Sequence, residues 1–93
     1  MRVEFVFFGP VRREIGVRET TKRYTKGATV DDLLDDLGCE FDKFDDLVLD
    51  DTGSIRGDIL ITINSHHLHH LNGRETSLSD GDIVRFTPHI QGG

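Results

Sequence analysis

The 93-residue sequence contains no tryptophan, two prolines and a single cysteine. Cys39 cannot form a disulfide within the chain, which favours a reducing compartment. Its sequence neighbours, Gly38 and Glu40, supply no cation to activate a thiolate. We therefore interpret Cys39 as a small filler after a helix, with a reactive thiol as the alternative.

Long hydrophobic runs are also missing. No apolar stretch approaches the roughly 18 residues that a membrane span requires. The first residues, Met1-Arg2-Val3-Glu4, place charge inside the first apolar stretch and are unlike a signal peptide. There is no internal repeat and no linker, and the length suits one small domain with one core. These observations predict a cytoplasmic protein without a membrane partner.

Positive charge is scarce. Asp and Glu number 17 against 11 for Lys and Arg, which gives a net charge of −6. Because an acidic chain without a basic stripe repels phosphates, nucleic acid is not an expected partner. The lysines are Lys22, Lys26 and Lys43. This acidic, lysine-poor composition suggests a halophilic protein, a hypothesis that loss of folded signal on salt removal would support.

Hydrophobic periodicity indicates the first elements. Residues 2–8 alternate as a strand, with Val6 and Phe8 on the face opposite the main apolar positions, and Gly9-Pro10 ends it. Residues 18–24 favour a second strand. A helix begins at Thr29, which can cap it, and Gly38 suits the position just past its end. The apolar stripe of this helix is formed by Val30, Leu33, Leu34 and Leu37.

The second half of the chain predicts one short helix around residues 41–48 and further strands over residues 58–63, 67–71 and 83–87. Pro88 ends the last strand because it cannot donate to a sheet ladder. A hairpin, a crossing helix and returning strands place the first strand beside the last. We therefore predict an α+β fold of the β-grasp type: a mixed four- to five-stranded sheet packed on one main helix. The domain would cover residues 1–87, followed by a flexible tail, 88–93.

That tail, Pro88-His89-Ile90-Gln91-Gly92-Gly93, ends in two glycines. Since glycine has no side chain, such an end can thread a narrow channel and present its terminal carboxylate without hindrance. A carboxylate is a poor acyl donor, but attachment of AMP makes it a good one. Attack by sulfur or an amine would then give a thiocarboxylate, a thioester or an amide. The alternative is a frayed terminus without function.

Four histidines, His66, His67, His69 and His70, flank Leu68. On a strand, His66 and His70 would share one face and the other two the opposite face. Two histidines at i and i+2 can bind zinc, but a closed site needs four ligands, and no Cys or Glu is adjacent. An exposed strand edge with adventitious metal affinity is the favoured interpretation, and a metal site is the alternative.

Several segments resemble one known family. Residues 78–88, followed by Gly92-Gly93, are similar to the C-terminal signature of the ubiquitin-like sulfur carriers: the MoaD subunit of molybdopterin synthase, ThiS, and the small archaeal modifier proteins. Residues 7–12 with Gly16, residues 28–30 and the pair Ile63-Asn64 also resemble family motifs. The acidic composition resembles the haloarchaeal modifiers. The chain departs from the family pattern at Arg13, at residues 87–89 and at Gln91, which is bulkier than usual.

The resemblance implies that Gly93 is adenylated by a ubiquitin-activating-type enzyme, which uses ATP, while the chain itself binds no cofactor. The acyl group would then form an isopeptide bond with lysines of target proteins, or a thiocarboxylate. Residues in positions where the family packs against partners are Phe8, Phe86, Pro88, Ile90 and Gln91. For Phe8 and Phe86 ordinary burial is the competing interpretation, and for Phe86 we favour it. Pro88 and Ile90 are expected past the last strand and exposed.

Three functions follow as hypotheses. The first is a modifier, a sulfur carrier or both: a monomeric co-substrate rather than an enzyme, because the sequence shows no nucleophile–base pair or metal triad. The second is the small subunit of molybdopterin synthase, which would bind the large subunit and donate sulfur to a pterin precursor. The third is a non-covalent β-grasp interaction module. Deletion of Gly93 would abolish the first two and spare the third.

Overall fold

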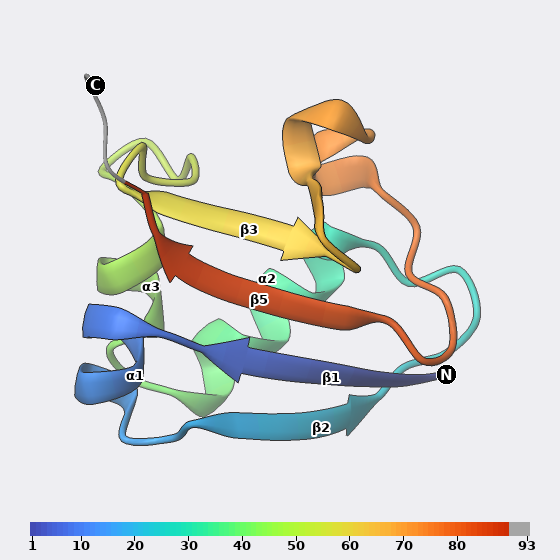
Figure 1. Ribbon diagram of the computed structural model, residues 1–93, viewed down its shortest axis with the longest axis horizontal. Helices are drawn as coiled ribbons and strands as arrows, with labels where there is room; N and C mark the ends of the chain where they lie inside the picture. The colour runs from blue at the N-terminus through green and yellow to red at the C-terminus, as the bar shows by residue number, and fades with distance from the viewer. Residues whose placement is uncertain (90–93) are drawn as a thin grey trace.

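The computed structural model of the protein describes residues 1–89. A mixed sheet of five strands, in the order β2-β1-β5-β3-β4, forms one layer of the fold (Figure 1). β1 and β5 pair in parallel, and the other neighbours pair antiparallel. The predicted placement of the first strand beside the last is confirmed. The strands are β1 (Arg2–Phe7), β2 (Glu19–Arg23), β3 (Ile59–Ile63), β4 (His66–His67) and β5 (Ile83–Pro88).

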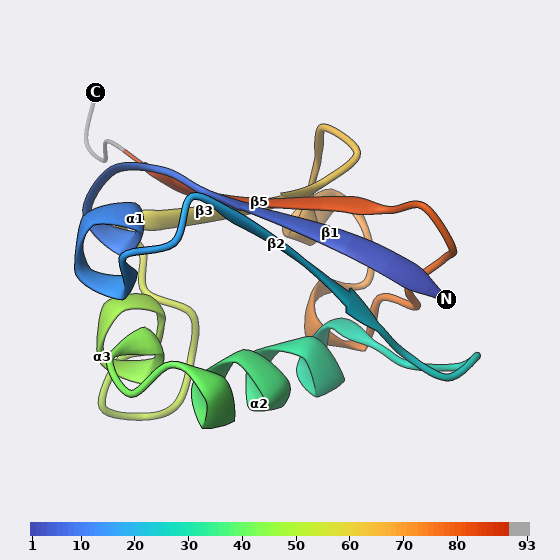
Figure 2. The same ribbon diagram turned by 90° about the horizontal axis from the view of Figure 1, so that it is seen from below.

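Helices cover one face of this sheet, and Figure 2 shows the opposite face of β1, β5 and β3 without a covering helix. The main helix is α2 (Val30–Glu40), accompanied by α1 (Gly9–Ile15) and α3 (Phe44–Val48). At the start of α2 the Asp32 carboxylate accepts hydrogen bonds from the Thr29 backbone N–H (2.8 Å) and hydroxyl (3.3 Å). This contact satisfies a backbone donor at the helix entry, and Thr29 is the N-cap residue, as predicted.

The core lies between the sheet and α2, and Phe86 stands near its centre. The Phe86 ring stacks on Phe7 with centroids 5.4 Å apart and meets Phe44 edge-on at 5.6 Å. The predicted stripe of α2 is buried in the same hydrophobic core as these rings. Because large aromatic side chains supply much of the buried area in a small domain, these contacts dominate its stability. No helix among residues 1–89 has both the length and the apolar character to cross a membrane.

The sequence did not predict α1. Gly9-Pro10 does end β1, but it also begins a helix, because proline is tolerated in the first helical turn, where its missing N–H would have no partner. The helix stops at Gly16, whose φ of 79° is left-handed and whose N–H donates to the Arg12 carbonyl at 2.9 Å. In this helix only Val11 is buried, so its hydrophobic pattern is too short to recognise.

The expected end of the main helix at Gly38 is wrong, since α2 continues to Glu40. Gly38 lies inside the helix, where a Cβ would stand 2.5 Å from the Oδ1 atom of Asp45. The glycine therefore allows the start of α3 to approach α2. Cys39 likewise lies inside α2 and is exposed, so it is not a filler placed after the helix.

The expected strand over residues 67–71 is also wrong. β4 contains two residues, His66–His67, and the 3₁₀ helices η1 (Leu68–His70) and η2 (Gly73–Glu75) follow it. Asn64 and Ser65 turn the chain with positive φ values of 51° and 75°, and Leu68 is then buried in the core. Because the strand ends so early, alternation no longer decides which histidines share a face.

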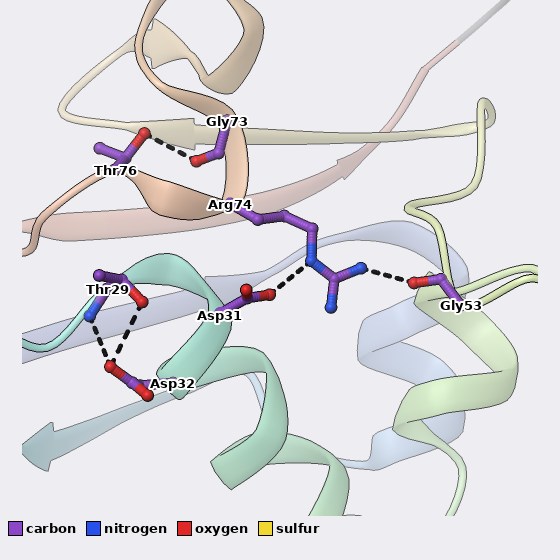
Figure 3. A network of polar contacts seen from close by, with 7 residues as sticks. All are labelled: Thr29, Asp31, Asp32, Gly53, Gly73, Arg74 and Thr76. Atoms are coloured by element: carbon purple, nitrogen blue, oxygen red, sulfur yellow. Dashed lines mark hydrogen bonds and ion pairs between the residues drawn. The ribbon is translucent and has the colours of Figure 1, made fainter.

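Arg74 joins three segments at the edge of the helical layer (Figure 3). Its Nε donates to the Asp31 carboxylate at 2.6 Å, and its Nη1 donates to the Gly53 carbonyl at 2.5 Å. Nearby, the Thr76 hydroxyl donates to the Gly73 carbonyl at 2.7 Å and closes the η2 turn. One arginine thus ties η2 to α2 and to the loop that precedes β3.

Candidate functional site at the exit of the last strand

β5 leads the chain toward the proposed acyl group, and it is paired on both sides. Phe86 lies opposite Phe7 of β1 and Ile61 of β3. Pairing with β3 continues past the end of β5, because the His89 N–H donates to the Asp58 carbonyl at 2.9 Å. The backbone is therefore held on both sides up to Phe86, and on the β3 side up to His89.

The beginning of α1 packs directly on the end of β5. The Phe8 N–H donates to the Phe86 carbonyl at 3.0 Å. Gly9 has a φ of +59°, and a Cβ on it would lie 2.9 Å from Pro88 Cγ. A glycine at this position lets the turn into α1 approach the proline at the end of β5. This contact fixes the position of Pro88 at the end of the last strand.

We call the end of β5, at Pro88 and His89, the exit. A small cavity of about 230 Å³ lies beside it. Apolar side chains of α1, α3 and β3 form part of its wall, together with an ion pair in which Arg56 donates to both carboxylate oxygens of Asp58, at 3.0 and 2.9 Å. The Arg56 guanidinium holds the pKa of Asp58 below its usual range, so the pair stays ionised at neutral pH. The cavity is lined by Pro10, Val11, Leu47, Arg56, Asp58, Ile59, Pro88 and His89.

The face of the sheet that no helix covers, called here the uncovered face, lies next to the exit. Along β1 and β5 the buried positions alternate with half-buried ones, which point away from the helices. On this face Arg85 stands between Val6 of β1 and Thr62 of β3, and Leu60 lies opposite Thr87. Phe8, next to the exit, keeps 38% of its surface exposed. The predicted alternation of residues 2–8 puts Val6 and Phe8 on this second face. Leu60 and Arg85 were not predicted as part of it, although both hold alternate positions in predicted strands.

The residues proposed to contact partners fall into three groups. Phe8 and Pro88 are exposed at the exit. Phe86 has no exposed surface, so it belongs to the core, and its place among the partner-contact residues is corrected. Pro88 is the last residue of β5 rather than a residue past it, because a sheet position that needs no N–H accepts proline. Ile90, Gln91, Gly92 and Gly93 lie outside the described residues.

The histidines lie at the other end of β3 from the exit. β4 pairs with Ile63 and Thr62, whereas the exit pairs with Ile59. The ring centroids of His69 and His70 are 4.2 Å apart, and His67 lies 5.3 and 5.5 Å from them. His66 is exposed on β4. Within residues 1–89, no three His, Cys, Asp or Glu side chains are arranged to hold a metal ion.

A five-stranded mixed sheet with a parallel central pair, wrapped around one main helix, defines a ubiquitin-like protein of the β-grasp class. A family model described as the ThiS family matches residues 5–93, so the chain belongs to that family. It is 32% identical, over the full length of both chains, to small archaeal modifier protein 3 of Haloferax volcanii. The predicted family and fold are confirmed.

Solved structures agree with this assignment. The crystal structure of SAMP1 from Haloferax volcanii superposes with a TM-score of 0.84 at 22% identity, with full coverage of both chains. A putative molybdopterin converting factor, subunit 1, from Pyrococcus furiosus gives a TM-score of 0.74 at 25% identity, covering 96% of this chain and 98% of the other. The chain thus belongs to a family of small modifiers and sulfur carriers whose members are generally not catalysts themselves.

Proposed function

We propose that the protein is a ubiquitin-like modifier, a sulfur carrier or both, and that it acts through the carboxylate of Gly93. The single observation that supports this best is the pairing of β5, which holds the chain between β1 and β3 up to Phe86 and against the β3 side up to His89, at one end of the sheet. The strand end is held in place, and the sequence then ends in two glycines, which have no side chains. This combination suits insertion of the terminus into another protein's active site.

The proposed chemistry begins with ATP held by a ubiquitin-activating-type enzyme. A Gly93 carboxylate oxygen attacks the α-phosphorus, pyrophosphate leaves, and an acyl-adenylate forms. A lysine amine of a target protein then attacks the acyl carbon, AMP leaves, and the nitrogen loses a proton to give the isopeptide. In the sulfur branch, hydrosulfide from a sulfur donor attacks the acyl carbon, AMP leaves, and loss of a proton yields the thiocarboxylate. The chain supplies no catalytic group to these steps and binds no cofactor of its own.

The partner is proposed to dock on the exit and the uncovered sheet face. Phe8 and Pro88 offer exposed apolar surface there, and Ile90 and Gln91 would extend the contact along the tail. Gly92 and Gly93 would enter the active site. We propose that the protein acts as a cytoplasmic monomer, since this role needs one tail and one docking face.

A second candidate is the small subunit of molybdopterin synthase. The similarity to the Pyrococcus furiosus chain, whose printed name refers to a molybdopterin converting factor, favours it. In that role the Gly93 thiocarboxylate would enter the large subunit and transfer sulfur to a pterin precursor. Lysine-linked conjugates in cell lysate would favour the modifier, whereas a pterin defect without conjugates would favour the synthase subunit.

Intact-mass measurement tests the proposal. The protein is incubated with ATP, an activating enzyme of this type and a sulfur donor, and ATP–pyrophosphate exchange is followed in parallel. We expect exchange to depend on the protein, and its mass to change by one oxygen-to-sulfur substitution or by attachment to a lysine. A chain that lacks Gly93 serves as the control and should support neither. An unmodified wild-type chain under all these conditions would leave only the non-covalent interaction module.

A further inference from the structure

We propose that Lys26 is the acceptor lysine when one copy of this chain is joined to another. The inference rests on the proposed function and concerns the amine rather than the acyl donor. The Lys26 nitrogen attacks the activated carbonyl carbon of Gly93 in a second copy, AMP or an enzyme thiol leaves, and the nitrogen loses a proton. The attacking amine must therefore have a free electron pair and room for the activating enzyme.

Two of the four amines in the sequence are held by other groups. The α-amine of Met1 donates to the Tyr24 carbonyl at 2.6 Å. The Lys22 ammonium lies 2.5 Å from Glu40 Oε1 and 3.3 Å from Asp36 Oδ2, and only 19% of its side chain is exposed. The hydrogen bond to Glu40 raises the pKa of Lys22. Lys22 therefore stays protonated and shielded.

Lys43 is the competitor. Its side chain is 65% exposed, and it forms one ion pair, with Glu14 Oε2 at 3.2 Å. An exposed pair of this kind contributes little stability, so it opens readily. It nevertheless keeps a carboxylate against the amine, and this contact must break before the amine can attack.

Lys26 differs from both. It is exposed in the turn that links β2 to α2, and it has no hydrogen-bond or ion-pair partner within residues 1–89. Residues 20–30 contain neither Asp nor Glu, in a chain whose net charge is −6. The turn itself is held in place: the Ala28 N–H donates to the Thr25 carbonyl at 3.2 Å, and the Ala28 carbonyl accepts from the Leu78 N–H at 2.9 Å. A firm turn thus presents an unpaired amine.

The topology separates this amine from the acyl donor. The Tyr24 N–H donates to the Met1 carbonyl at 2.8 Å, which places the turn at the beginning of β1. β5 runs parallel to β1 and ends at the opposite end of the sheet (Figure 1). Attachment at Lys26 therefore leaves the acceptor's own exit and uncovered face accessible. Copies joined in this way would form a linear, end-to-end chain.

The test uses the full-length protein with ATP and an activating enzyme, and maps the linkage by mass spectrometry after trypsin. Cleavage after Arg85 leaves residues 86–93 as a tag on the modified lysine. We expect the tag on Lys26, loss of self-linked product in Lys26→Arg, and retention in the matched Lys22→Arg/Lys43→Arg double variant. ATP–pyrophosphate exchange should stay unchanged in all of them, because none of these residues lies at the exit.

Self-linkage that persists in Lys26→Arg, with the tag on Lys43 or Lys22, would overturn the assignment. So would a wild-type chain that is adenylated and joined to other proteins but never to itself. Failure of the proposed function would differ visibly, since the wild-type chain would then show no pyrophosphate exchange at all.

Discussion

Gly9 and Pro88 are in contact across the end of the sheet, where a Cβ on Gly9 would come within 2.9 Å of Pro88 Cγ. Residues 79 positions apart in the sequence thereby position the exit of the last strand. The glycine meets two requirements at once, a left-handed φ of +59° and a close approach to the proline ring.

Gly9→Ala should therefore destabilise the protein for both reasons. The left-handed conformation alone costs about 1–2 kcal/mol for a residue with a Cβ, and displacement of Pro88 adds to it. Gly16→Ala is the matched control, because Gly16 has a φ of +79° but nothing within 4 Å of its Cβ position. Urea unfolding should show a larger loss for Gly9→Ala. Equal losses in the free energy of unfolding would show that the contact with Pro88 does not contribute to stability.

A polar network around the buried carboxylate of Asp82 should also be sensitive to substitution. Asp82 is 7% exposed, and its carboxylate accepts from the Ser79 N–H at 2.7 Å and from the Asn64 side-chain amide at 2.8 Å. The Asn64 side-chain oxygen in turn accepts from the Ile83 N–H at 2.9 Å. This network fastens the start of β5 to the end of β3.

Asp82→Ala removes the acceptor of both part-buried hydrogen bonds, and an unpaired buried donor would cost about 1–3 kcal/mol as an upper limit. We expect a loss of roughly 2 kcal/mol or more in the free energy of unfolding, measured with urea. Asp51→Ala, at an exposed loop position, should change it by less than about 0.5 kcal/mol. Similar values for the two variants would contradict the role assigned to the network.

Tyr24 provides a spectroscopic prediction. Burial and the hydrogen bond that its hydroxyl donates to Asp36 at 2.8 Å raise its pKa above the ordinary value of about 10. Because the sequence has one tyrosine and no tryptophan, ultraviolet absorbance of the phenolate reports this group alone. The phenolate should appear at higher pH than in free tyrosine. Asp36→Asn should lower the pKa partway, since burial remains.

The same raised pKa makes stability depend on pH. The neutral phenol is favoured in the folded state, so its contribution is fully present below pH about 10. It is lost as the pH rises through the folded-state pKa, because the unfolded chain releases this proton first. Tyr24→Phe should remove that part of the alkaline dependence in urea unfolding measured at several pH values. An unchanged alkaline slope would show that other groups govern it.

The sequence predicted the elements whose hydrophobic pattern is long enough to recognise. Alternation gave β1, β3 and β5, and the stripe from Val30 to Leu37 gave α2. α1 and β4 were missed or misplaced because tertiary contacts define them: Val11 is the one buried anchor of α1, and burial of Leu68 ends β4 early.

The site was predicted less completely than the fold. Phe8 and Pro88 could be named from a motif, but the contact of Gly9 with Pro88 depends on the parallel pairing of the first and last strands. The same pairing brings Arg85 beside Val6. The strand order therefore decides which residues on the uncovered face lie side by side. Local sequence does not encode this order.

We expect substitution of Phe8 to weaken recognition by the activating enzyme. Two large hydrophobic side chains among residues 1–89 are well exposed, Phe8 and Leu71, each at 38%. Phe8 stands at the exit, whereas Leu71 follows η1 at the other end of β3. Leu71→Ala is therefore a control matched in exposure but distant from the docking face.

We expect Phe8→Ala to lower the activating enzyme's kcat/KM for this protein by about tenfold, because losing an aromatic contact in the proposed interface would cost about 1.4 kcal/mol or more. ATP–pyrophosphate exchange at varied protein concentration measures it, and circular dichroism verifies that both variants fold. Leu71→Ala should leave kcat/KM unchanged. Equal effects of the two substitutions, or none from either, would place the docking surface elsewhere on the protein.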